Sequence, residues 1–154
     1  MSMLRSAALS ALVIVMYASA APLAADGRIA TVKALRCTFR QSAVGGWKRD
    51  GAPHAAVKAS TLILRFDAID VDSGTAQLKT GSMSNELTAK LAAGYLHFMQ
   101  TFRTGPLYTT TVFDNPAEGA KFKAVHSRHE YFTTPVPGAT SSPEQYYGEC
   151  EAVG

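Results

Sequence analysis

Short segments in which residues alternate between two faces, separated by turn-forming residues, constrain the fold of this chain more than any other feature. In segment 61–69 (TLILRFDAI), Leu62, Leu64 and Phe66 fall on one face of an extended strand, a spacing typical of a half-buried β-strand. Asp72-Ser73-Gly74 then predicts a tight turn into a returning strand. No window of helical length is amphipathic and no internal repeat is present. About eight antiparallel strands are therefore expected, at 32–40, 61–69, 75–80, 86–91, 95–102, 107–113, 121–132 and 145–151.

The two cysteines help to choose between the all-β architectures. Cys37 falls on the first predicted strand and Cys150 on the last. A disulfide between them requires Cα atoms within about 7 Å of each other. An up-and-down meander that closes into a small barrel places its first and last strands side by side, so we favour that fold over the alternative, a β-sandwich. Residues 45–53 are expected to form a long polar connection and 133–143 a surface loop.

The N-terminus has the organisation of a secretory signal peptide. A short segment with Arg5 precedes the apolar run at 8–16 (ALSALVIVM), and small residues follow, with cleavage expected after Ala20 or Ala25. The run is too short to cross a bilayer core of about 30 Å. The sequence predicts a signal peptide over 1–25, a single β domain over 26–154, no transmembrane anchor, and a periplasmic or secreted product.

The expected export of the chain places its two cysteines in an oxidising compartment. In an oxidising compartment Cys37 and Cys150 are expected to form a disulfide. Neither has another cysteine or a histidine at the spacing of a zinc site, so no metal is predicted, and no cofactor motif is present. The formal charge of +3 comes from scattered lysines and arginines, which argues against nucleic-acid binding.

The segment 124–130 (AVHSRHE) carries the residues most suggestive of chemistry. On a strand His126 and His129 would project from opposite faces, whereas His126, Arg128 and Glu130 would share one. The HExxH zinc motif is not completed, because Thr133 stands where its second histidine would be. We favour a structural interpretation, in which His126 and Arg128 are buried and bonded to backbone carbonyls or carboxylates on other strands.

Aromatic residues are the other candidates for a binding site. Several could line a barrel mouth, although aromatics at alternate strand positions more often belong to a core; they are Trp47, Tyr95, Phe98, Tyr108, Tyr146 and Tyr147. The candidate ligand-binding residues from sequence are His126, Arg128, Tyr108 and Trp47.

The C-terminal part carries a family resemblance. The stretches 111–113 (TVF), 124–129 (AVHSRH) and 143–150 (PEQYYGEC) resemble a group of uncharacterised secreted bacterial proteins. The resemblance covers roughly the last third of the chain, and the strand at 62–69 more loosely. It implies a bacterial periplasmic setting and no mechanism. The strand count is also similar to that of calycin-type barrels, the lipocalin and avidin architecture, but a shared fold does not give a function.

Three functions are compatible with these patterns. The first is a non-catalytic module that binds a small apolar or amphipathic ligand in the barrel. The second is an envelope protein-interaction or inhibitor module that acts through loops 43–56 and 133–143. The third, which we favour least, is an enzyme using His126, Arg128 or His129, and a cluster of His97 with His126 would support it. An open interior would favour the first function, and a fully packed one would exclude it.

Overall fold

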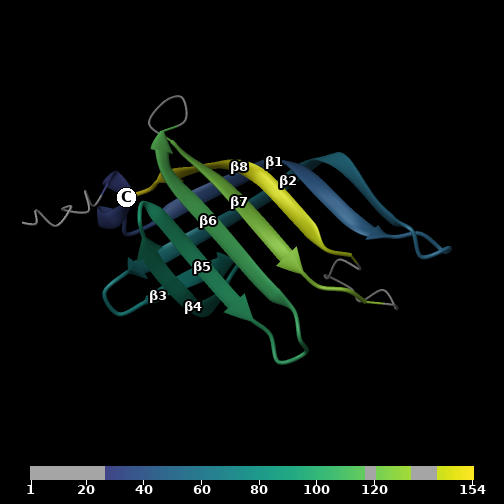
Figure 1. Ribbon diagram of the computed structural model, residues 1–154. Coiled ribbons are helices and arrows are strands. Elements are labelled where there is room, and N and C mark those ends of the chain that lie inside the picture. The colour runs from purple at the N-terminus through teal and green to yellow at the C-terminus, as the bar shows by residue number, and fades with distance from the viewer. Residues whose placement is uncertain (1–26, 117–120, 133–141) are drawn as a thin grey trace, which may run out of the picture.

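The computed structural model describes residues 27–116, 121–132 and 142–154, and these residues form an all-β fold (Figure 1). A short 3-10 helix, η1, precedes eight strands. Their bounds are η1 Arg28–Thr31, β1 Leu35–Trp47, β2 Pro53–Asp70, β3 Thr75–Thr80, β4 Met83–Ala92, β5 Tyr95–Thr101, β6 Leu107–Pro116, β7 Phe122–His129 and β8 Glu144–Ala152. The predicted signal peptide lies outside the described residues.

The strands follow the predicted up-and-down order in one ring-like sheet. Each strand pairs antiparallel with the next one in the chain, and β8 pairs with β1, so the strand order closes on itself. Cys37 stands directly opposite Cys150 in the β1–β8 register, and the two form a disulfide. The eight antiparallel strands and the disulfide predicted from the sequence are thus confirmed.

The first hairpin is much longer than the sequence predicts. Of residues 45–53, expected to be a polar connection, only 48–52 form the turn: β1 continues to Trp47 and β2 begins at Pro53. The turn between them is closed by Lys48, whose N–H donates to the Ala52 carbonyl at 2.9 Å, and by Gly51, whose φ of 81° suits glycine. The end of the hairpin, residues 43–57, projects from the ring, and we call it the arm (Figure 1); β8 pairs with its first strand only as far as Val44. Most of the second predicted loop, 133–141, lies outside the described residues.

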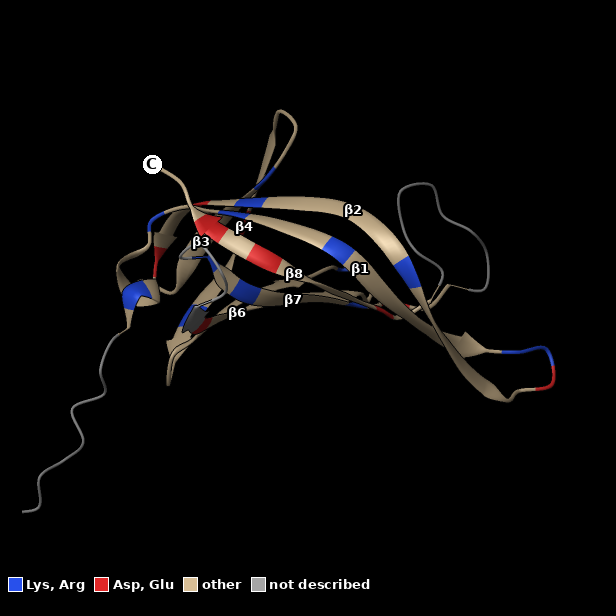
Figure 2. Cartoon of the chain, turned by 90° about the horizontal axis from the view of Figure 1, so that it is seen from above, with Lys and Arg blue, Asp and Glu red and all other residues tan. Residues whose placement is uncertain are grey.

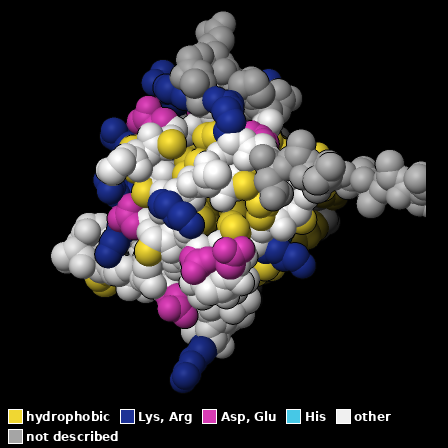
Figure 3. All heavy atoms as spheres, turned by 90° about the vertical axis from the view of Figure 1, so that its left-hand side faces the viewer, with side chains coloured by type: hydrophobic (Ala, Val, Ile, Leu, Met, Phe, Trp, Pro, Cys, Tyr) yellow, Lys and Arg dark blue, Asp and Glu magenta, His cyan; other side chains and the backbone are white. Residues whose placement is uncertain are grey.

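One end of the ring is filled by an apolar core. The fully buried rings of Phe66 and Phe98 stack there with their centroids 4.1 Å apart. Ile29 of η1 is also fully buried, and η1 contacts β5 and β6. Figure 3 views the molecule from this end, where apolar side chains are visible between charged and polar ones. The packing leaves the opposite end of the ring as the place for a cavity.

A close approach of β8 to β1 depends on Gly148. The register of β1 shifts between Phe39 and Gln41 against both neighbouring strands. A Cβ atom at Gly148 would meet the Thr38 carbonyl oxygen and lie 2.7 Å from the Cα atom of Phe39. Only glycine therefore fits opposite this irregularity without moving the backbone.

Candidate ligand-binding site

A cavity of about 840 Å³ occupies the end of the ring away from η1. The β3–β4 turn, the β5–β6 connection and the end of β7 surround it. Much of its wall is apolar, formed by Leu62, Leu64, Leu78, Met83, Phe102 and Phe132. Polar side chains also line it, and four of them lie close together on β6, on β7 and just after β7: Tyr108, His126, Arg128 and Glu130. We call the 840 Å³ space the cavity below.

Strand register brings the polar residues of the cavity together. Two cross-strand rows run over β6, β7 and β8: Tyr108–Arg128–Glu144 and, one step deeper, Thr110–His126–Tyr146. Residues two apart on a strand point to the same face, so both rows face the interior. We call these six residues together with Glu130 the polar cluster.

Arg128 lies at the centre of the polar cluster. Its guanidinium carbon is 5.2 Å from the ring centroid of Tyr108 and 5.2 Å from that of Tyr146. Both distances are within the range of cation–π attraction. The Arg128 Nε atom also donates a long hydrogen bond of 3.4 Å to His126 Nε2. The guanidinium is therefore held by two aromatic rings and a neighbouring imidazole.

The two tyrosine hydroxyls are bound to carboxylates. Tyr108 donates to Glu130 Oε2 at 2.7 Å, and Tyr146 donates to Glu144. Burial, reinforced by these hydrogen bonds, raises the pKa of each tyrosine from 10.0 to about 12. Both hydroxyls thus remain protonated donors at neutral pH.

The tautomer of His126 follows from its partners. Arginine Nε can only donate, so His126 Nε2 must accept from Arg128. The proton then lies on Nδ1, which donates to the Thr110 hydroxyl at 2.8 Å. Burial, and secondarily the charge of Arg128, lower the pKa of His126 from 6.5 to about 4. His126 is neutral at pH 7 and both of its nitrogens are engaged.

This histidine should make folding stability depend on pH. Because the pKa is lower in the folded state, the unfolded chain binds more protons between about pH 6.5 and 4, and stability falls as the pH falls through that window. The expected loss from His126 is about 3 kcal/mol by pH 4. Urea unfolding of the parent and of His126→Gln at pH 7 and pH 4 measures it, since the variant lacks this titration. Equal losses of unfolding free energy in the parent and in His126→Gln would contradict the assignment of this pH dependence to His126.

The structure brings three of the four predicted binding residues to the cavity. His126, Arg128 and Tyr108 contribute to it, but Trp47 does not. Trp47 lies at the end of β1 in the arm, 57% exposed, in edge contact with Tyr131 at 5.3 Å. His129 is exposed, whereas His126 is buried, as alternation along the strand predicts.

The structure corrects the expected bonding of the His126 strand. Burial of His126 agrees with the structural interpretation, but its partners are the Thr110 hydroxyl and Arg128 rather than carbonyls or carboxylates. Arg128 is only half-buried and lines the cavity. His97 does not join His126, because it alternates with the buried Leu96 and Phe98 on β5 and faces the other side of the sheet, where its Nδ1 atom is hydrogen-bonded to Thr111 at 3.0 Å. Thr110 and Glu144 were not among the residues predicted from the sequence. Alternation within a strand does not show that Thr110 lies opposite His126 and Glu144 opposite Arg128.

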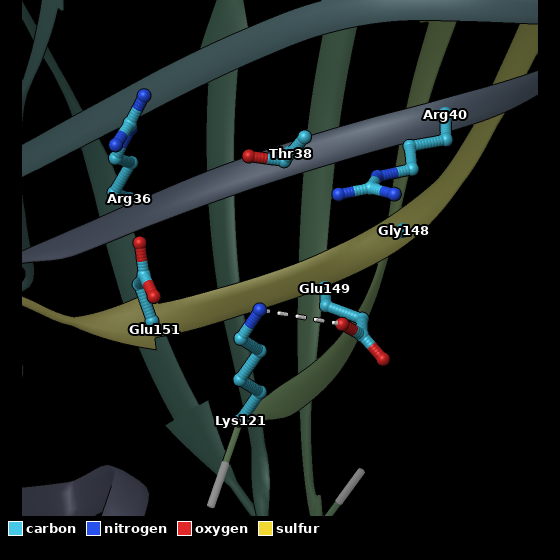
Figure 4. Close-up of a pocket in the computed structure, with 7 residues that line it drawn as sticks. All are labelled: Arg36, Thr38, Arg40, Lys121, Gly148, Glu149 and Glu151. Carbon is cyan, nitrogen blue, oxygen red and sulfur yellow. Dashed lines mark ion pairs between the residues drawn. The ribbon is translucent and has the colours of Figure 1, made fainter. Parts of the chain in front are cut away.

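A second, smaller groove of about 340 Å³ lies on the outside of the ring, over β1 and β8. Figure 2 shows charges of both signs on this side of the molecule, and Figure 4 shows the groove itself. Arg36, Arg40 and Lys121 face Glu149 and Glu151 there, and Lys121 Nζ is 3.8 Å from Glu149 Oε2. The opposite charges largely compensate each other, so this groove is a weaker candidate than the cavity.

Comparisons with known proteins give no further constraint on the site. No protein-family model, no curated protein and no solved structure matches the chain. Across 27–116, 121–132 and 142–154, no three His, Cys, Asp or Glu side chains are grouped so as to hold a metal ion. The same residues contain no helix that is long and apolar enough to span a membrane.

Proposed function

We propose that the chain is a non-catalytic module that binds a small amphipathic molecule in the cavity. The observation that carries this proposal is the combination of a largely apolar wall with the polar cluster beside it. The cavity volume of about 840 Å³ is within the range of about 300–1,000 Å³ that is common for small-molecule sites. The stacked rings of Phe66 and Phe98 close the packed end behind it.

The chemistry of the polar cluster supports binding over catalysis. A general base should have a pKa near the working pH and a free nitrogen within reach of substrate. The pKa of His126 is lowered to about 4, and its two nitrogens are occupied by Thr110 and Arg128. The two carboxylates of the cluster each accept a tyrosine hydroxyl. These contacts favour a role in holding a ligand.

We further propose that the chain acts outside the cytoplasm, in the periplasm or as a secreted protein. The disulfide between Cys37 and Cys150 is of the kind that persists in oxidising compartments. The signal-like N-terminal sequence supports the same location.

A protein-interaction role is the second candidate. It is favoured by the arm, where Trp47 is 57% exposed and Val57 is 68% exposed. Exposed large apolar side chains on a projecting hairpin are a feature of contact surfaces. A module that acts only through the arm would not need its cavity, which gives a way to separate the two candidates.

Titration with N-phenylnaphthylamine, an uncharged apolar fluorophore, tests the proposed function. We expect the parent to bind it with an increase in fluorescence. Filling the cavity by Leu78→Trp, or independently by Leu62→Trp, should weaken binding about tenfold or more, since either indole would occupy ligand space. Val57→Trp adds the same side chain on the exposed arm and should bind like the parent. Absence of binding to the folded parent, or equal binding by all variants, would contradict a ligand-binding cavity.

A further inference from the structure

The guanidinium of Arg128 has donors for which the described residues supply no partner. Its Nε atom donates to His126, and its guanidinium carbon lies 5.2 Å from the ring centroids of Tyr108 and Tyr146. Within the described part of the chain the ion pairs are Arg65–Asp67 and Lys121–Glu149, neither of which includes Arg128. The terminal nitrogens of Arg128 therefore have no carboxylate partner among these residues.

Those terminal nitrogens can be reached from the cavity. Arg128 lines the cavity and is half-buried. No fully buried side-chain nitrogen or oxygen among the described residues lacks a hydrogen-bond partner. Donors of Arg128 that have no partner must therefore be accessible, and the cavity is the space that Arg128 lines.

The two carboxylates of the polar cluster already accept hydrogen bonds from other donors. Glu130 is buried and accepts from the Tyr108 hydroxyl, and Glu144 accepts from Tyr146. Each of these carboxylates thus accepts a hydrogen bond from a tyrosine hydroxyl of the protein.

Two other cations line the cavity, Arg65, which is paired with Asp67, and Lys79, which is exposed on β3. The guanidinium of Arg128 is thus the half-buried cation of the cavity whose terminal nitrogens have no carboxylate partner among the described residues.

Resting on the proposed function, we propose that the ligand is an apolar chain ending in a carboxylate, which binds the terminal nitrogens of Arg128. A planar guanidinium with two parallel N–H donors matches a carboxylate in geometry and charge, and such bidentate bonds are stronger than neutral ones. The contacts of the guanidinium with the rings of Tyr108 and Tyr146, and of Nε with His126, restrain the side chain and so reduce the ordering cost of that contact. The tail then lies along Leu62, Leu64 and Leu78.

Displacement of N-phenylnaphthylamine by three ten-carbon probes tests the head group. Decanoate, decanol and decylammonium share one tail and differ in charge, and each is used below its micelle concentration at neutral pH. Decanoate should bind the parent about tenfold or more tighter than decanol, and decylammonium should bind weakest. This comparison needs no variant, so it does not depend on how a mutation affects folding.

A matched pair of variants assigns the preference to Arg128. Arg128→Gln should reduce the ratio of decanoate to decanol affinity to about one. Arg40→Gln removes an arginine from the outer face of β1 and should keep the ratio of the parent. Equal binding of the three probes, or tightest binding of decylammonium, would overturn the carboxylate inference while leaving the cavity proposal standing. Failure of all three to displace the fluorophore would overturn both.

Discussion

Replacing Cys150 with alanine is expected to lower the free energy of unfolding by about 4–5 kcal/mol, since the disulfide it removes closes a very long loop. The two cysteines are 113 residues apart in the sequence. In the chain-entropy model the bridge acts by restricting the unfolded chain, and the effect grows with loop length. The bridge also joins the two strands that close the ring, β1 and β8. Urea unfolding of parent and variant measures the difference.

Two controls distinguish the effect of losing the disulfide from the effect of replacing a cysteine side chain. Unfolding of the parent in a reducing agent should reproduce most of the loss without a mutation. The double variant Cys37→Ala/Cys150→Ala should match the single one, because both lack the same bond. A loss below about 1 kcal/mol in all three cases would show that the β1–β8 hydrogen bonds hold the ring closed without help from the disulfide.

Truncating Phe98 to alanine should cost about 3–5 kcal/mol, the range for removing a buried aromatic side chain. Phe98 is 1% exposed, and its ring stacks on that of Phe66. The two rings border a void of about 10 Å³, lined also by Leu64 and His126, between the packed end and the cavity. The truncation should therefore extend the cavity inward as well as destabilise the fold. Urea unfolding measures the loss of stability, and fluorophore titration measures the change in the cavity.

Met99 is the matched control for this prediction. It follows Phe98 on β5 but is 37% exposed, so Met99→Ala should change stability by less than about 1 kcal/mol. A similar, small loss for both variants would show that the stacked rings do not form the floor of the cavity.

Much of this fold can be predicted from residue alternation and from two cysteines. Alternation in 61–69 places Leu62, Leu64 and Phe66 on the inner face, as the structure confirms. The arm could not be predicted, because Gly45-Gly46 and the alanines of 55–56 have weak strand preference and no alternation. They become strand because β1 and β2 supply each other with backbone hydrogen bonds over their whole length.

The candidate site could be predicted only in part from the sequence. Alternation puts His126 and Arg128 on one face of β7, but it does not say which residues of β6 and β8 lie beside them. That depends on register, and β6 pairs with β7 through an irregularity between Phe113 and Pro116. The contacts of Arg128 with Tyr146, and of Tyr146 with Glu144, therefore follow from the assembled sheet and not from any local motif.

The central claim, that the cavity holds a ligand, is tested most directly by locating a bound probe. Nuclear Overhauser effects between N-phenylnaphthylamine and assigned methyl groups report contacts within about 5 Å. The cavity account predicts contacts to the methyls of Leu62, Leu64 and Leu78, which line it, and none to Val57 on the arm. Contacts to Val57 without any to the three leucines would contradict it.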